Sequence, residues 1–128
     1  MLDASAAIEL AMNRDVGAEV ARRLDDAQTV HVPHLFAVEV AQGLRRLAAV
    51  GVTTPERAAE ALLDVAELDA VRHEHEPFLA RIWQLRDDLT AYDAAYVALA
   101  EALDVSLVTL DARLATAPGH RARVELIA

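Results

Sequence analysis

Four acidic side chains are placed where they could act together as ligands of a divalent metal ion: Asp3, Glu39, Asp93 and Asp111. Asp3 and Asp111 each end a short apolar segment of strand type, and Asp93 lies in the first turn of a helical segment that leads into the second of these strands. Glu39 lies between two valines early in another helical segment. Hard cations such as Mg²⁺ and Mn²⁺ prefer oxygen ligands, and a pair of them can activate water and stabilise a leaving oxygen. The acids therefore predict phosphoryl chemistry that depends on Mg²⁺ or Mn²⁺.

Each acid also has a purely structural interpretation. Asp3 can cap the helix that begins just after it, and Asp111 can cap the segment that follows it. Thr90 and Asp93 match the pattern in which a threonine caps a helix and an acid occupies its third position. Glu39 can be a solvated helix residue. Carboxylates grouped at one edge of a sheet raise each other's pKa, however, and a bound cation removes that repulsion, so the set favours a metal site over independent caps.

Short strands and helices alternate along the chain and must position these acids. We expect strands at 1–4, 29–32, 68–73, 105–110 and 123–127, and helices at 5–12, 15–27, 34–50, 54–68, 77–88, 90–103 and 111–117. Strands this short, separated by helices, are typical of a parallel sheet that helices cover on both faces. Ligands of such α/β sheets bind outside the carboxyl ends of the strands, which is where Asp3 and Asp111 are expected.

Composition excludes several other functions. The chain has no cysteine, which rules out disulfides and thiolate metal sites, and no lysine, which rules out the phosphate-binding loop of P-loop NTPases and a receiver domain that depends on a lysine. No apolar segment is long enough to span a membrane, and no signal peptide is evident, so we expect a cytoplasmic protein. The net charge of −9 is unusual for a nucleic-acid-binding protein, so contacts to a polyanion must come from local arginines or bound metal ions.

Several segments together resemble a known family. They are LDAS at the start, VEV at 38–40, LTAYDAAYVALAEAL from residue 89 and LVTLDARLA from residue 107. In this order they resemble the PIN domain and, within it, the VapC toxins of bacterial toxin–antitoxin systems. The resemblance covers essentially the whole chain, and the stretch 89–115 is its most specific part.

The resemblance implies a single PIN-like domain over residues 1–128, with a three-layer α/β/α fold around a central parallel sheet of about five short strands. It implies an endoribonuclease whose acidic quartet, here Asp3, Glu39, Asp93 and Asp111, holds Mg²⁺ or Mn²⁺, supported by the hydroxyl residues Ser5 and Thr109. The implied substrates are structured RNAs such as tRNA or ribosomal RNA. The implied partners are a second copy of the chain, in a homodimer, and a cognate VapB-type antitoxin that blocks the site. The alternative is a non-catalytic PIN-like module that binds another protein.

The chain departs from the family pattern at two places. Only two residues precede Asp3, so the first strand is short or the true start lies upstream. Asp88 stands where relatives often carry Asn, either as a fifth acid of the site or as an exposed residue at a helix junction.

Further residues have chemical potential outside the quartet. Arg113, two residues after Asp111, is expected to contact an RNA phosphate, and a basic inhibitor is expected to insert an arginine among the acids. The pairs Arg22–Arg23 and Arg45–Arg46 are expected on solvated helix faces.

Histidines and aromatic residues leave alternatives open. His73 and His75 could form a zinc pair or end a solvated strand, and His31 and His34 are not expected to converge. Tyr92 and Tyr96 could stack on a base, although Tyr96 has the spacing of a core residue. Core positions are also expected for Phe78, Trp83 and Leu85.

Overall fold

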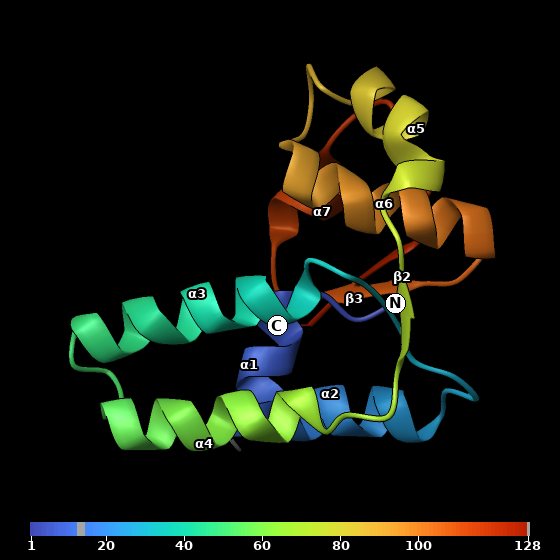
Figure 1. Ribbon diagram of the computed structural model, residues 1–128. Helices are drawn as coiled ribbons and strands as arrows, with labels where there is room; N and C mark the ends of the chain where they lie inside the picture. Colours follow the sequence, from blue (N-terminus) through green and yellow to red (C-terminus); the bar gives the residue numbers. More distant parts are fainter. Residues whose placement is uncertain (13–14, 128) are drawn as a thin grey trace.

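A computed structural model describes residues 1–12 and 15–127 of the chain, in which short strands and helices alternate (Figure 1). The strands are β1 (His31–Pro33), β2 (Val71–His73), β3 (Leu107–Thr109) and β4 (Val124–Leu126). The helices are α1 (Ala4–Met12), α2 (Asp15–Asp25), α3 (Phe36–Ala49), α4 (Pro55–Ala66), α5 (Leu79–Gln84), α6 (Ala91–Leu103) and α7 (Ala112–Thr116), with a 3-10 turn, η1 (Glu76–Phe78), before α5.

The sheet is parallel and is held together by the first residues of the chain. β1 pairs with β2, and β3 pairs with β4, both in parallel register. Leu2 forms a parallel bridge with Val108 of β3, and its backbone N–H donates to the carbonyl of His31 in β1 at 3.2 Å. The order across the sheet is therefore β2, β1, the segment at Leu2, β3 and β4. Among the described residues, the predicted first strand is reduced to this single bridge.

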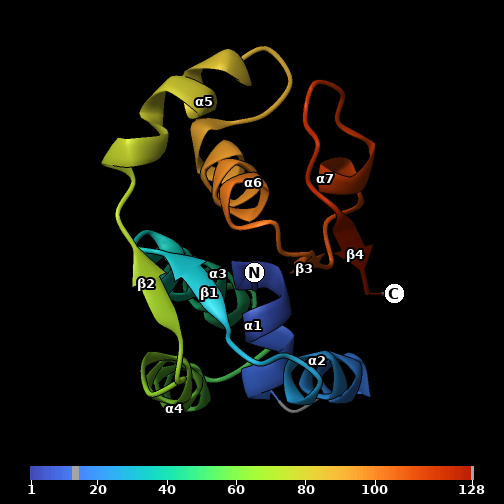
Figure 2. The ribbon, with the colours of Figure 1, turned by 90° about the vertical axis from the view of Figure 1, so that its right-hand side faces the viewer.

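Helices cover both faces of this sheet (Figure 2). α5, α6 and α7 lie on one face, and α1 to α4 lie on the other. The predicted three-layer α/β/α fold is therefore confirmed. The arrangement brings the starts of α1 and α7 close to the ends of the strands that precede them, because α1 begins two residues after the bridge at Leu2 and α7 begins three residues after the end of β3.

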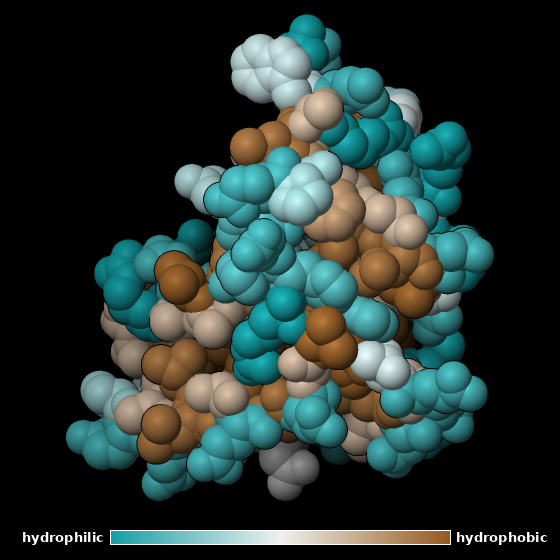
Figure 3. Space-filling view, turned by 45° about the vertical axis from the view of Figure 1, so that its right-hand side comes forward, coloured by the Kyte–Doolittle hydropathy of each residue, from teal (hydrophilic) through white to brown (hydrophobic). Residues whose placement is uncertain are grey.

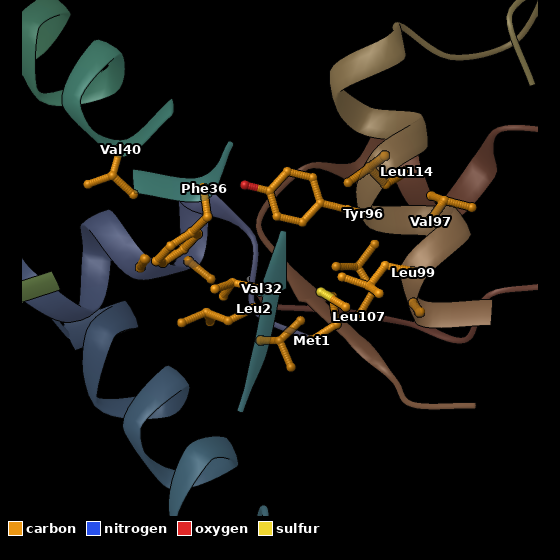
Figure 4. Packing of buried hydrophobic residues seen from close by; sticks show 14 of the residues in the cluster. Met1, Leu2, Val32, Phe36, Val40, Tyr96, Val97, Leu99, Leu107 and Leu114 are labelled. Carbon is orange, nitrogen blue, oxygen red and sulfur yellow. The ribbon is translucent and has the colours of Figure 1, made fainter. Parts of the chain in front are cut away.

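The hydrophobic core lies between the sheet and the helices on each side (Figure 4). Leu2, Val32 and Leu107 of the sheet are completely buried, and Phe36 at the start of α3 packs into the same cluster. α6 is the central helix of its layer, since every residue from Ala94 to Ala100 is buried. A helix with so little exposed surface needs little polar sequence, which explains the run of alanines in this segment.

Capping residues set the starts of two helices as predicted. The Thr54 hydroxyl accepts the backbone N–H of Arg57 at 3.1 Å, with Pro55 at the first position of α4. The Thr90 hydroxyl accepts the backbone N–H of Asp93 at 3.2 Å at the start of α6. Both bonds satisfy a backbone donor that has no partner within its own helix.

The prediction that Trp83 is a core residue is wrong. α5 ends at Gln84, and the Trp83 side chain near this end is 68% exposed. The Arg86 guanidinium lies 4.8 Å from the centre of the indole ring, a cation–π contact at the surface. Leu85, by contrast, is buried as expected, and Phe78 is partly buried.

None of the helices within the described ranges has the length and apolar character that crossing a membrane requires.

Candidate active site

The four predicted acids line one cavity of about 280 Å³. Asp3 comes from the start of α1, Glu39 from α3, Asp93 from α6, and Asp111 from the residue before α7. The rest of the wall consists of Ala4, Ser5, Ile8, Gln42, Gly43, Arg46 and Tyr96. Residues up to 108 positions apart along the chain thus meet at the edge of the sheet, where they were predicted from the sequence.

All four acids stand at helix N-termini. The Asp3 carboxylate accepts the backbone N–H of Ala6 at 3.0 Å, and the Asp111 carboxylate accepts that of Arg113 at 2.9 Å. Asp93 and Glu39 lie in the first turns of α6 and α3. The capping interpretation is therefore confirmed for Asp3 and Asp111, and it is compatible with a shared site, because the positive ends of the helix dipoles favour negative charge at this point.

Asp3 is the deepest of the acids, with 6% of its surface exposed. One carboxylate oxygen accepts the Ser5 hydroxyl at 2.7 Å, and the other accepts the Thr109 hydroxyl. Burial raises the pKa of Asp3, while the bonds from Thr109 and Ser5 oppose that rise. These bonds fix the orientation of the carboxylate before any ligand arrives.

The same two hydroxyls tie the end of β3 to the start of α1. The Ser5 hydroxyl accepts the backbone N–H of Leu110 at 3.0 Å, and the Thr109 hydroxyl accepts that of Asp111 at 3.0 Å. Ser5 and Thr109 therefore contact both Asp3 and the backbone that carries Asp111, as a supporting role for these residues requires.

Asp93 and Asp111 have opposite electrostatic environments. Burial raises the pKa of Asp93, and the nearby charge of Asp111 adds to that rise. The Arg113 side chain, 80% exposed, donates from Nε at 3.0 Å and from Nη2 at 2.6 Å to the two oxygens of Asp111, and these bonds lower the pKa of Asp111. Arg113 is thus bonded to an acid of the cavity, although it is not itself among the lining residues.

Glu39 and Tyr96 each place an unsatisfied polar atom in the cavity wall. Glu39 Oε1 and the Tyr96 hydroxyl oxygen are buried and have no hydrogen-bond partner among the described residues. Burial raises the pKa of Glu39; the neighbouring Tyr96 hydroxyl opposes the rise, and the charges of Asp93 and Asp3 add to it. A buried acceptor of this kind is costly unless something donates to it or binds it.

The donor set fits a hard divalent cation. All four acids offer oxygen ligands, and the unpartnered Oε1 of Glu39 is an acceptor that a cation would satisfy. In the present side-chain positions, no three acidic or histidine side chains of the described residues are arranged to hold one ion. Asp3 is bonded to Ser5 and Thr109 and Asp111 to Arg113, so ion binding requires side chains to turn, above all Asp111 away from Arg113.

Arg46 lines the cavity, although the pair Arg45–Arg46 was expected only on a solvated helix face. Arg46 is exposed at the mouth of the cavity, whereas Arg45 bonds Gln42 on the helix surface at 3.0 Å. The available signal was helical spacing, since Arg46 follows Glu39 by two turns of α3 and so shares its face. Asp88 is exposed and does not line the cavity.

The histidines form two pairs between the segments that contain β1 and β2, which was not anticipated from the sequence. His31 Nδ1 and His73 Nε2 are 2.9 Å apart, and the rings of His34 and His75 lie 6.1 Å apart. His75 Nε2 also accepts the backbone N–H of Leu35 at 3.0 Å. His31 and His34 do not meet each other, but each meets a histidine that the parallel pairing brings alongside.

The two tyrosines of α6 have different positions. Tyr92 is 65% exposed and does not line the cavity, so it remains available at the surface. Tyr96 is 2% exposed and packs in the core, as its spacing predicted, while its hydroxyl reaches the acids.

Comparisons with known proteins agree with this geometry. The family model for the PIN domain matches residues 1–119. The chain is 43% identical over 128 residues to Ribonuclease VapC12 of Mycobacterium tuberculosis, covering 100% of this chain and 98% of the relative. It is 40% identical to Ribonuclease VapC1 of the same organism, covering 99% of this chain and 96% of the relative. The crystal structure of PAE2754 from Pyrobaculum aerophilum superposes with a TM-score of 0.68 at 27% identity, covering 96% of this chain and 81% of that one.

Proposed function

This chain belongs to the PIN domain family and, within it, to the VapC ribonucleases of toxin–antitoxin systems; from that premise we propose that it cuts RNA with Mg²⁺ or Mn²⁺ held by Asp3, Glu39, Asp93 and Asp111. The observation that carries the proposal is the convergence of these carboxylates, each from a different helix start, in one cavity. Repelling carboxylates that share a buried wall raise each other's pKa, and a cation is the partner that removes this repulsion.

The chain's own residues hold and orient the reacting groups. Ser5 and Thr109 hold the two oxygens of the Asp3 carboxylate, and Asp93 on α6 and Glu39 on α3 add their carboxylates to the same cavity. A bound divalent ion would polarise a phosphoryl oxygen and lower the pKa of a water ligand. A carboxylate of the set that does not ligate the ion would accept the proton from that water.

RNA contacts come from arginines at the mouth of the cavity. Arg46 on α3 lines the cavity, and Arg113 on α7 pairs with Asp111, one of its acids. In a chain of net charge −9, local cations of this kind must supply the attraction to phosphate. We take the substrate to be a structured cytoplasmic RNA, either tRNA or ribosomal RNA.

The antitoxin partner is proposed to be of VapB type and to act on the same cavity. A basic segment that inserts an arginine can form paired hydrogen bonds with a carboxylate such as Asp93 or Asp111 and displace the metal. The negative charge of the chain favours the approach of such a segment.

We further propose a homodimer of single-domain chains spanning 1–128. Val71 on β2 and Leu79 and Trp83 on α5 are exposed by 45%, 55% and 68%. Figure 3 shows apolar side chains between polar ones on the face that carries these elements. Exposed apolar surface of this kind marks association sites, and sedimentation of the chain and of Trp83→Glu would show whether this face holds two copies together.

Expression in a bacterial host tests the proposed function. Wild-type chain should arrest growth and leave RNA ends that map to defined positions. Glu39→Gln should abolish both effects, since it removes one carboxylate of the cavity. Glu56→Gln is the matched control, because Glu56 also lies in a first helical turn, that of α4, but outside the cavity. Growth arrest by wild type without new RNA ends would support the alternative, a non-catalytic module that binds a protein.

A further inference from the structure

We propose that Tyr96 is a positioning residue, whose hydroxyl donates a hydrogen bond to Glu39 and sets this carboxylate for the metal ion. The inference rests on the proposed function of the acid cavity and adds a residue to it. It concerns a neutral side chain that the acidic pattern of the sequence did not indicate.

Tyr96 reaches the cavity from the core. It lies on α6, one turn after Asp93, and its ring is 2% exposed. Figure 4 shows the ring pointing from α6 toward Phe36 at the start of α3, the helix that carries Glu39, with the hydroxyl oxygen at its tip. The ring thus fills the core, and Tyr96 is also one of the residues that line the cavity.

The strongest observation is a complementary pair of unsatisfied atoms. Glu39 Oε1 and the Tyr96 hydroxyl oxygen are both buried, both belong to residues that line the cavity, and neither has a hydrogen-bond partner among the described residues. A carboxylate only accepts hydrogen bonds, and a phenol can donate one. A small turn of the Glu39 side chain therefore satisfies both atoms.

The surroundings keep the hydroxyl in its donating form. Burial raises the pKa of Tyr96, and the charges of Glu39, Asp3 and Asp93 add to that rise. A neutral donor close to three acids holds a carboxylate and leaves its negative charge in place. An arginine at this position would neutralise that charge. Groups that orient metal ligands in this way affect metal affinity even though they do not touch the metal.

A phenylalanine would serve the core equally well. It keeps the ring and removes an unsatisfied buried oxygen, so a purely structural account predicts that Tyr96→Phe leaves the protein intact or more stable. The hydroxyl is therefore the part of Tyr96 that packing does not require.

The test compares Tyr96→Phe with Tyr92→Phe, which removes an exposed hydroxyl from the same helix and keeps its ring. Mn²⁺ affinity is measured by calorimetry, metal-free melting by circular dichroism, and kcat and KM by RNA cleavage. We expect Tyr96→Phe to weaken Mn²⁺ binding about 10-fold or more, and to lower kcat with KM for RNA unchanged. Its metal-free melting temperature should hold or rise. Tyr92→Phe should retain wild-type Mn²⁺ affinity.

Two results would overturn the inference and are distinguishable from failure of the proposed function. Tyr96→Phe with wild-type Mn²⁺ affinity, whether its melting temperature changes or not, would show that the hydroxyl does not position Glu39. Wild-type protein that neither binds Mn²⁺ nor cleaves RNA would remove the proposed function and this inference with it.

Discussion

Protonation of a single carboxyl is expected to change the stability of the metal-free protein. Burial raises the pKa of Asp93, so the charged carboxylate destabilises the folded state. This destabilisation disappears as the pH falls, because the carboxyl becomes protonated between its raised pKa in the folded state and the ordinary pKa near 4. Without metal, Asp93→Asn should therefore melt above wild type at pH 7.5, and the difference should shrink toward zero by about pH 4.

Thermal melts in EDTA across this pH range measure that difference. Burial lowers the pKa of His31, so protonation of His31 destabilises the folded protein as the pH falls, which is opposite to the effect of Asp93. This contribution is the same in both proteins and cancels when the variant is compared with wild type. A variant that melts below wild type at neutral pH would show that Asp93 stabilises its helix start more than it repels the other acids.

Arg113 is expected to act on both RNA and the metal. Arg113→Ala removes a cation at the cavity mouth, so KM for RNA should rise and the slope of log Kd against log salt should fall by about 0.7–0.9, with the cut site kept. The same change frees Asp111 from its bonds to Arg113, so Mn²⁺ affinity should hold or increase. The control is Arg123→Ala, since Arg123 pairs with Asp104 away from the acids. Unchanged cleavage kinetics would exclude Arg113 from RNA contact.

Residue types and their order along the chain were sufficient to locate the acids, but not every neighbour. Asp3 and Asp111 follow strands, and the edge of a parallel sheet brings such positions together. The exposure of Trp83 and the position of Arg46 depend on side-chain directions that only the packed helices decide. The contact between His31 and His73 depends on strand register, which the sequence pattern does not specify.

Helices were predicted well where capping residues mark their starts. α4 and α6 begin at their threonine caps. α3 was expected from His34 but begins at Phe36, with Leu35 as its N-cap. The predicted strands are longer than the observed ones, since each observed strand pairs over only three residues.

Close packing of α1 and α2 predicts a large effect at Gly17. A Cβ atom built at this position would lie 2.3 Å from the backbone oxygen of Glu9 in α1, so the two helices would have to move apart. Gly17→Ala should therefore destabilise the protein by about 1–3 kcal/mol in denaturant unfolding, despite the better helix propensity of alanine. Ala18→Ser, on the exposed side of the same helix, should change stability by less than about 0.5 kcal/mol. A stabilised Gly17→Ala protein would contradict this packing.

At the scale of the whole molecule, negative charge is gathered at the candidate site of a chain that is already negatively charged. A chain of net charge −9 gathers four carboxylates in one cavity, with the exposed Arg46 in its lining and the exposed Arg113 bonded to Asp111. In the proposed function, a bound cation has two effects: it offsets repulsion among the acids, and it lets a polyanionic substrate approach them. Metal ions should consequently stabilise the fold as well as support cleavage.

The most direct test is the rate of RNA cleavage by the purified protein as a function of Mn²⁺ concentration, starting from protein treated with EDTA. We predict no cleavage after chelation, a saturating recovery as Mn²⁺ is added, and a loss of several orders of magnitude in Asp93→Asn, whose metal-free melting temperature is undiminished. Cleavage that persists in EDTA, or an Asp93→Asn protein that cuts RNA at the wild-type rate, would contradict the assignment of the acid cavity as a metal-dependent ribonuclease site.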